Sequence, residues 1–170
     1  MIDHRLAKIV LVTCLALYAL LVALDNLVDW GANHAFVAHV MSMDDVFPDN
    51  PTRGRALTGA GWHTAAYLLI IALEAATGFL YAAGAVAMVR ARRAPAERFA
   101  RGKRWVVWAT VVGFVVWFFA FMVVAGEYFA SWQSRTWNAQ DAAFRIYVTM
   151  LVVLVYVGLP EPAVEVTPPS

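Results

Sequence analysis

The sequence predicts an all-α, polytopic integral membrane protein, a four-helix transmembrane bundle with a short external amphipathic helix after the first span. The first observation is composition, because 62% of the 170 residues are hydrophobic and only 15% are charged. A soluble domain has roughly 45–50% and 25%. The second observation is that four segments reach or approach the length of about 20 apolar residues that crosses a bilayer. So much apolar surface exceeds what one small soluble core can bury, and it must therefore face lipid.

The four expected spans are about 9–30, 62–89, 105–129 and 143–159. The second span contains one charged residue, Glu74. The fourth span is short, and Arg145 stands in its opening turn, from which a long cationic side chain can extend to the membrane surface. The spans predict one membrane domain, 1–159. The Pro-rich and acidic segment 160–170 predicts a disordered cytoplasmic tail.

The charge distribution predicts the orientation of the chain. The connection 90–104 contains seven cations and one acid, Glu97, and short cytoplasmic loops carry the excess of Lys and Arg. We therefore expect this loop and both termini in the cytoplasm, with 31–61 and 130–142 on the external side. The net charge of +1 gives no field that would attract nucleic acid.

Two stretches outside the spans resemble a known family. They are Phe36 to Pro48 (FVAHVMSMDDVFP) and Gly126 to Gln140 (GEYFASWQSRTWNAQ). Both are similar to a bacterial family of "predicted small integral membrane proteins" that is carried as a domain of unknown function, with a GE[WY]F-x-x-WQS-x-x-WN-x-Q-type signature. Here Tyr128 stands where the family has an aromatic Trp, and Ala139 stands where it has Gly. The resemblance implies four helices in the bacterial inner (cytoplasmic) membrane and supplies no function.

Glu74 is the most unusual residue inside a span. It lies about midway along the second span, where an ionised carboxylate is costly. We therefore expect it to be protonated or paired. Two interpretations remain open, a carboxylate of a proton relay or ion site, and an interhelical hydrogen bond that fixes packing.

A second polar group is expected near the external end of the first span. Asp25, Asn26 and Asp29 lie there, and the two acids share one helix face. Glu127 could join the same layer. One interpretation is an interfacial polar network, and the other is a cation site. The cationic partners that we consider are Arg53, Arg55 and Arg145.

Three histidines fall on the external side. His34, His39 and His63 could supply imidazoles to a haem, and His39 with Met41 and Met43 offers ligands that suit Cu(I). Packing of methionines on an amphipathic face is the alternative. No histidine pair lies within two spans, so the sequence identifies no cofactor.

The external segments also predict a cap over the bundle. Trp is expected at the membrane surface as an anchor, but this role does not explain the nearby side-chain amides of Gln133, Asn138 and Gln140. We expect them to bond to the first external loop, or to contact a partner or a small polar ligand. The cap candidates are His39, Asp44, His63, Trp132, Gln133, Trp137, Asn138 and Gln140.

Three functions remain as hypotheses, since we find no Ser-His-Asp order and no phosphate loop. The first is a non-catalytic accessory or assembly subunit of a larger respiratory or transport complex. Besides lipid, its expected partner is another membrane protein or a second copy. The second is a proton, ion or small-solute carrier that uses Glu74 and the external acids. The third is a small redox protein that holds haem, copper or quinone.

Overall fold

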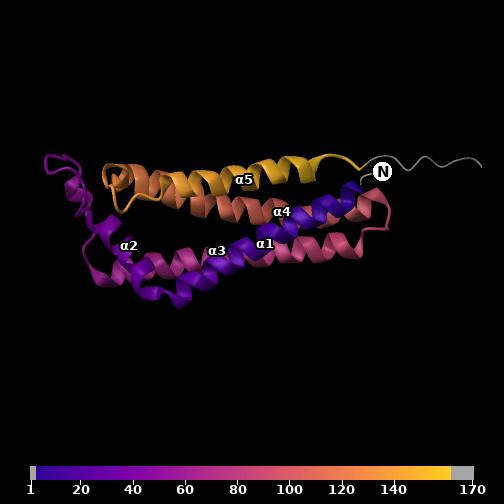
Figure 1. Cartoon of the computed structure of the whole chain (residues 1–170), viewed down its shortest axis with the longest axis horizontal. Helices are drawn as coiled ribbons and strands as arrows, with labels where there is room; N and C mark the ends of the chain where they lie inside the picture. Colours follow the sequence, from indigo (N-terminus) through magenta and orange to yellow (C-terminus); the bar gives the residue numbers. More distant parts are fainter. Residues whose placement is uncertain (1–2, 162–170) are drawn as a thin grey trace, which may run out of the picture.

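The computed structural model describes residues 3–161, and every regular element in this range is a helix (Figure 1). The expected disordered tail lies, except for its first two residues, outside the described residues. The elements are α1 (His4–Val28), α2 (Trp30–Ser42), η1 (Arg53–Arg55), α3 (Ala60–Arg90), α4 (Ala96–Phe114), η2 (Val115–Tyr128), η3 (Ser131–Gln133) and α5 (Gln140–Gly158).

Four helices are long and apolar enough to cross a membrane: α1, α3, the continuous α4 and η2, and α5. This confirms the predicted fold class. The third helix begins at Ala96, before the expected start near residue 105, because Arg and Lys are good helix formers and let the helix continue through the basic segment. Its outer part, η2, is a π-helix, a wider form that occurs mostly as short insertions in α-helices.

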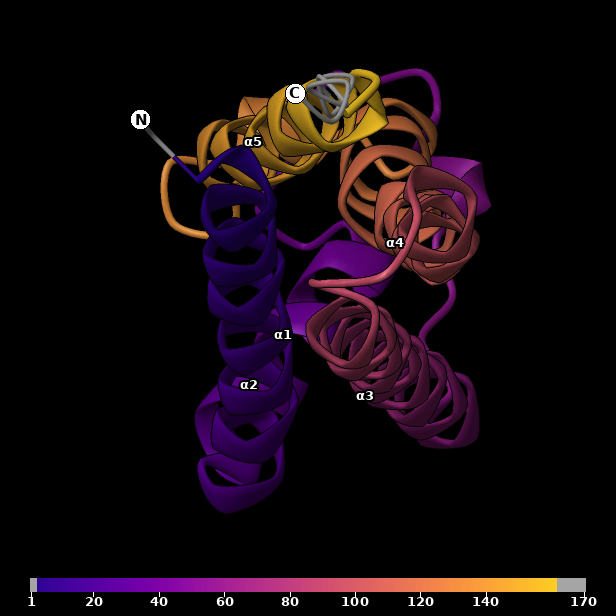
Figure 2. The same ribbon diagram turned by 90° about the vertical axis from the view of Figure 1, so that its right-hand side faces the viewer.

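The four helices form two pairs that meet at one end of the molecule and separate at the other. α1 packs along α3, α3 packs along α4, and α5 packs on α4 and η2. The α3–α4 turn, the start of α1 and the end of α5 lie together at the closed end (Figures 1 and 2). Gly78 lets α1 and α3 approach closely, because an added Cβ would lie 2.6 Å from Leu20 Cγ. We call the closed end the basic end.

α2 and the segments 43–59 and 129–139, which we call the two cap loops, cover the open end and form a cap (Figure 1). α2 begins at Trp30, directly after α1, and buries Val37, Val40 and Met41. It ends where Met43 adopts a left-handed backbone conformation with φ of 51°. These residues belong to a second apolar cluster, separate from the bundle core.

Lys8 ties α1 to the end of α5 at the basic end. Its side chain is 1% exposed, and Nζ donates to Leu159 O at 2.6 Å and to Glu161 Oε1 at 2.8 Å. Lys103 donates to the same carbonyl at 2.9 Å and pairs with Glu161 at 2.7 Å. Two cations thus hold a carbonyl and a carboxylate just beyond the C-terminal end of α5, where the last helical carbonyls favour positive charge.

Burial alone would raise the pKa of Glu161, but hydrogen bonds from Lys103 and Lys8 outweigh it and hold that pKa below its ordinary value of 4.5. A lowered pKa stabilises the folded protein above the ordinary value, and this contribution is lost as pH falls through the folded value. We therefore expect Glu161→Gln to lower the free energy of unfolding by about 1–3 kcal/mol at pH 7.

The same variant should lose less stability than the wild type when pH falls below about 4.5. Thermal unfolding in detergent micelles from pH 7 to pH 3 measures both effects. Glu97→Gln is the matched control, because Glu97 is exposed in the first turn of α4. Equal pH curves for the wild type and Glu161→Gln would contradict the expectation.

Candidate functional site

Glu74 lies inside the bundle and is paired with a side chain of α1. It is 2% exposed, and its Oε2 accepts a hydrogen bond from Asn26 Nδ2 at 2.7 Å. Tyr67, two turns before Glu74 on the same face of α3, donates its hydroxyl to Asn26 O at 2.5 Å. That carbonyl belongs to the last turn of α1, where carbonyl groups have no partner within the helix. Asn26 therefore links the end of α1 to α3 through both its side chain and its backbone.

The pairing with Asn26 also sets the depth of Glu74. By sequence number the residue is near the middle of α3, and sixteen residues separate it from Arg90 at the basic end. Fourteen residues separate it from Ala60 at the cap side. Glu74 thus lies near the middle of α3, at the level where α1 ends.

The other expected polar residues do not join this pair. Asp25 and Asp29 are both exposed, and Asp29 forms the joint between α1 and α2 by donating its backbone N–H to Asp25 O at 2.8 Å. Glu127 is exposed on η2, and Arg145 lies across the gap on α5. Within residues 3–161, none of these four forms an ion pair. The expected acidic layer with a bridging arginine is therefore not assembled, because α1 and α5 separate towards the cap.

Arg53 and Arg55, the other cations considered for that layer, bond within the cap. Arg53 donates to Pro48 O at 3.3 Å, and Arg55 donates to Tyr128 O at 3.3 Å. Both arginines therefore connect loop carbonyls.

Gln133 joins the two cap loops, 43–59 and 129–139. Its Oε1 accepts from Phe47 N and from Asn50 Nδ2, each at 2.9 Å. Nearby, Ser134 Oγ donates to Asp45 Oδ2 at 2.5 Å, and the Trp132 ring meets the Phe47 ring edge-on at 5.9 Å. The two loops therefore form one folded unit.

The remaining cap candidates have separate local roles. His39 bonds to Asp44 Oδ2 at 2.7 Å and stacks on Trp137 at 4.2 Å between ring centroids. Asn138 Oδ1 accepts from Gln140 N within its own loop. The Gln140 side chain lies beside Gly126, where an added Cβ would collide with it.

The histidines and methionines near the cap each have their own contacts. His34 bonds to Thr64 Oγ1 at 3.1 Å, and His63 Nε2 bonds to Leu57 O at 2.6 Å. Met41 and Met43 are buried in the cluster beneath the cap. Among the residues that the structure describes, no group of three or more His, Cys, Asp or Glu side chains gathers in a way that could hold a metal ion.

Two lateral openings lie where the two helix pairs separate. The first, which we call the apolar groove, has a volume of about 300 Å³ and lies between α3 and η2, with α2 at its outer end. It is lined only by apolar side chains, those of Phe36, Val37, Val40, Met41, Ala66, Leu69, Ile70, Leu73, Val115, Val116, Phe119, Ala120, Phe121, Val124, Ala125 and Phe129.

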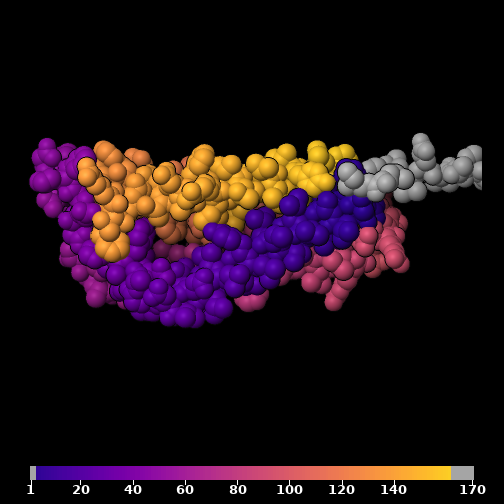
Figure 3. Space-filling model, in the orientation of Figure 1, coloured from indigo at the N-terminus to yellow at the C-terminus, as the bar shows by residue number. Residues whose placement is uncertain are grey.

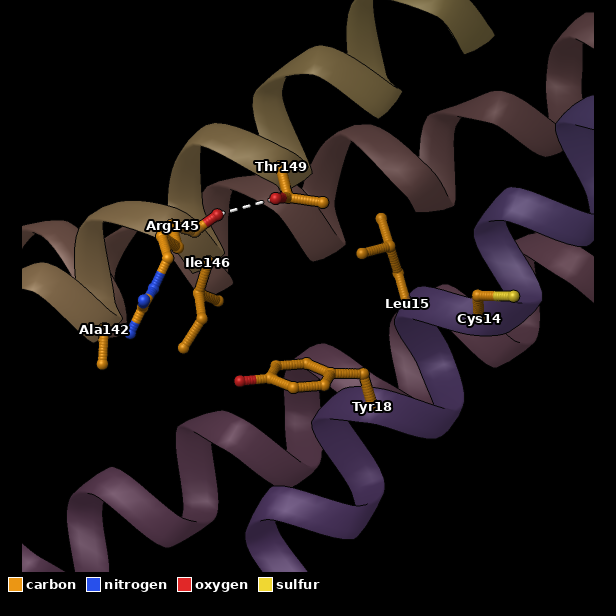
Figure 4. A pocket seen from close by; sticks show the side chains of 7 residues that line it. All are labelled: Cys14, Leu15, Tyr18, Ala142, Arg145, Ile146 and Thr149. Atoms are coloured by element: carbon orange, nitrogen blue, oxygen red, sulfur yellow. Dashed lines mark hydrogen bonds between the residues drawn. The ribbon is translucent and has the colours of Figure 1, made fainter.

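The second opening, which we call the α1–α5 cleft, has a volume of about 520 Å³ and carries a cation (Figure 4). The space-filling view shows the molecule hollowed between α1 and α5 (Figure 3). Its lining residues are Cys14, Leu15, Tyr18, Ala142, Arg145, Ile146 and Thr149.

Sequence reasoning missed several residues that matter here. Tyr67 and Tyr18 were not considered, although both lie on the helices that carry Glu74 and Asn26. The seven-residue spacing of Tyr67 and Glu74 was the available signal, because it places both on one face of a helix. The contacts of Lys8 have no signal in the sequence either, because its partners Leu159 and Glu161 lie about 150 residues away along the chain.

The fold and these features define a small polytopic membrane protein with a folded cap and two openings. The chain belongs to the family DUF2165, described as "predicted small integral membrane protein", whose family model matches residues 4–160. No curated protein and no solved structure matches the chain.

We expect Asn26→Ala to lower the free energy of unfolding by about 1–3 kcal/mol, because Glu74 loses a hydrogen-bond donor inside the bundle. In the background Glu74→Leu the same change should have little effect, because no carboxylate remains to be paired. Asn33→Ala is the control, since Asn33 Nδ2 donates to Asp29 O in its own turn. Unfolding of each variant in micelles measures the coupling between Asn26 and Glu74. If Asn26→Ala lowered the free energy of unfolding equally in both backgrounds, the expectation would be contradicted.

We expect Gln133→Ala to loosen the cap without unfolding the bundle. Two donors of the first cap loop lose their acceptor, so hydrogen exchange at the Phe47 amide should rise roughly fivefold to tenfold. Asn138→Ala is the control, because Asn138 bonds within its own loop. Mass spectrometry of the detergent-solubilised protein measures the exchange rate. An unchanged exchange rate of the peptide that contains Phe47 would refute the role of Gln133.

Proposed function

We propose that this protein is a non-catalytic accessory or assembly subunit of a larger membrane complex, respiratory or transport. The apolar groove supports this proposal most strongly. Ala66, Ala120 and Ala125 lie within it, and small residues let a neighbouring helix approach closely in a membrane. Leu69 and Phe119, which are 60% and 54% exposed, also line the groove. A transmembrane helix of a partner protein would pack between these large side chains.

We further propose that the protein resides in the bacterial inner membrane with its basic end in the cytoplasm. Both the start of α1 and the end of α5 lie at this end, so both termini would be cytoplasmic. The support is the cation excess, because Arg5 and Lys8 join the seven cations of 90–104 there. The cap would then be external.

The accessory role predicts a stoichiometric companion when the tagged protein is extracted from its native membrane in mild detergent. Ala66→Trp fills the groove and should reduce recovery of that companion at least tenfold. Val152→Trp is the control, because Val152 is 63% exposed on α5 and does not line the groove. Mass spectrometry of the purified sample identifies and counts companions.

Recovery of a lone monomer, or equal companion recovery from both variants, would refute the accessory role. Recovery of a dimer of this chain alone would also refute it and would assign the groove to self-association. Each variant should first be shown to unfold at the temperature of the wild type, so that loss of a companion reports on the groove.

A carrier of protons, ions or small solutes is the second candidate, and the burial of Glu74 favours it. An intramembrane carboxylate is a candidate proton or ion site, and Asn26 gives this one a single hydrogen-bonded partner from α1. The exposed Asp25 and Asp29 stand near the same level, towards the cap. This function predicts a pH-dependent flux in reconstituted vesicles that Glu74→Gln abolishes, and a flux equal to that of empty vesicles would refute it.

A further inference from the structure

Arg145 is a cation within the membrane-spanning length of α5. It lies in the second turn of the helix, beside the apolar residue Ile146. A charged side chain at this depth needs a counter-charge or access to the membrane surface. Side chains of an α-helix lean towards its N-terminus, and the N-terminus of α5 is at the cap. The guanidinium is therefore directed to the depth of the headgroups on the cap side.

Within residues 3–161, no carboxylate forms an ion pair with Arg145. Asp141 stands one turn earlier on α5, and Asp25 and Asp29 end α1 across the cleft. No carboxylate of the described residues lies within 4.0 Å of the guanidinium. The side chain is exposed and extends from α5, beside Ala142, into the gap (Figure 4).

The rest of the cleft combines an apolar wall with further polar groups. Leu15 and Ile146 stand on opposite walls, on α1 and α5. The hydroxyl of Tyr18 points across the gap towards α5 (Figure 4), where it can donate to the same anion as Arg145. Thr149 is already engaged, since its Oγ1 donates to Arg145 O at 2.7 Å.

The cleft is closed at one end and open at the other. At the basic end α1 and α5 are joined by Lys8 and Leu159 and by His4 and Tyr156, so the cleft is closed there. Towards the cap the two helices separate (Figure 1). Arg145, near the cap-side start of α5, lines this part of the cleft. A molecule that fills it would place an apolar chain towards the closed end and a charged head at the open end.

We propose that the α1–α5 cleft is a binding site for an anionic phospholipid of the cap-side leaflet. The lipid phosphate bonds to the Arg145 guanidinium, with Tyr18 as a second donor, and one acyl chain lies between α1 and α5. An arginine fork matches the geometry of phosphate oxygens and forms strong charge-assisted hydrogen bonds with them. The inference concerns a different opening from the apolar groove and does not depend on the proposed subunit function.

The test compares two lipids that share acyl chains and differ in net charge. Dioleoylphosphatidylglycerol and dioleoylphosphatidylcholine are titrated into the full-length protein in a neutral detergent, and native mass spectrometry counts the bound lipids. The wild type should bind phosphatidylglycerol at least tenfold more tightly. Arg145→Gln should lose this preference, whereas Arg145→Lys should retain part of it, because the charge remains but the two-pronged donor geometry is lost.

Two further variants locate the site. Tyr18→Phe should weaken phosphatidylglycerol binding about twofold to fivefold, because the lipid phosphate loses one weak hydrogen bond. Arg135→Gln is the matched control, because Arg135 is an exposed arginine of the second cap loop and does not line the cleft. Its binding should equal that of the wild type.

Cys14 provides an independent readout, because it is the single cysteine of the chain and lines the cleft. Bound phosphatidylglycerol should slow its alkylation by N-ethylmaleimide in the wild type and leave the rate unchanged in Arg145→Gln. Equal affinity of the wild type for the two lipids would overturn the proposal. So would a preference that survives Arg145→Gln, an equal loss in Arg135→Gln, or a Cys14 rate that phosphatidylglycerol does not change in the wild type.

Discussion

Lys8 joins the first and last transmembrane helices at the basic end, and the form of the whole bundle depends on this junction. A buried ammonium must be paired or hydrogen-bonded, and here Leu159 and Glu161 provide the partners. The partners lie just beyond the end of α5, so the junction fixes where α5 ends relative to α1. From this closed end the two helix pairs are free to separate, which they do towards the cap.

The separation has a different cause on each side of the bundle. On one side α1 stays packed along α3, whereas α5 stays packed along α4 and η2, so the two helices diverge towards the cap. On the other side η2 begins at Val115, where the lining of the apolar groove also begins. A π-helix is wider and changes the angular spacing of side chains. The side chains of η2 therefore point in other directions than those of α4, and they no longer all face α3.

The cap and the Glu74 pair meet at the level where α1 ends. Tyr67 bonds to the last turn of α1 and packs against Trp30 at the start of α2, with ring centroids 4.9 Å apart. α2 then contributes to the apolar cluster beneath the cap loops. The buried carboxylate and the cap are thus connected through a few side chains, and a change in one can reach the other through Asn26 and Tyr67.

The amino-acid sequence by itself determined the membrane class, the four spans and the helix that follows the first span. These follow from the length and apolar composition of each segment, because whether a segment can cross the bilayer depends on that segment alone. The Gln133 contacts were partly foreseeable, because amides near an interface need partners from a nearby loop.

Only the tertiary structure decided which polar residues meet. Asn26 and Asp29 are neighbours in sequence, yet one pairs with Glu74 and the other forms an exposed joint, because helix rotation and the end of α1 separate them. The same holds for the two openings. Their existence depends on the angle between helix pairs, which is set by contacts such as Lys8 with Leu159 between residues far apart in the chain.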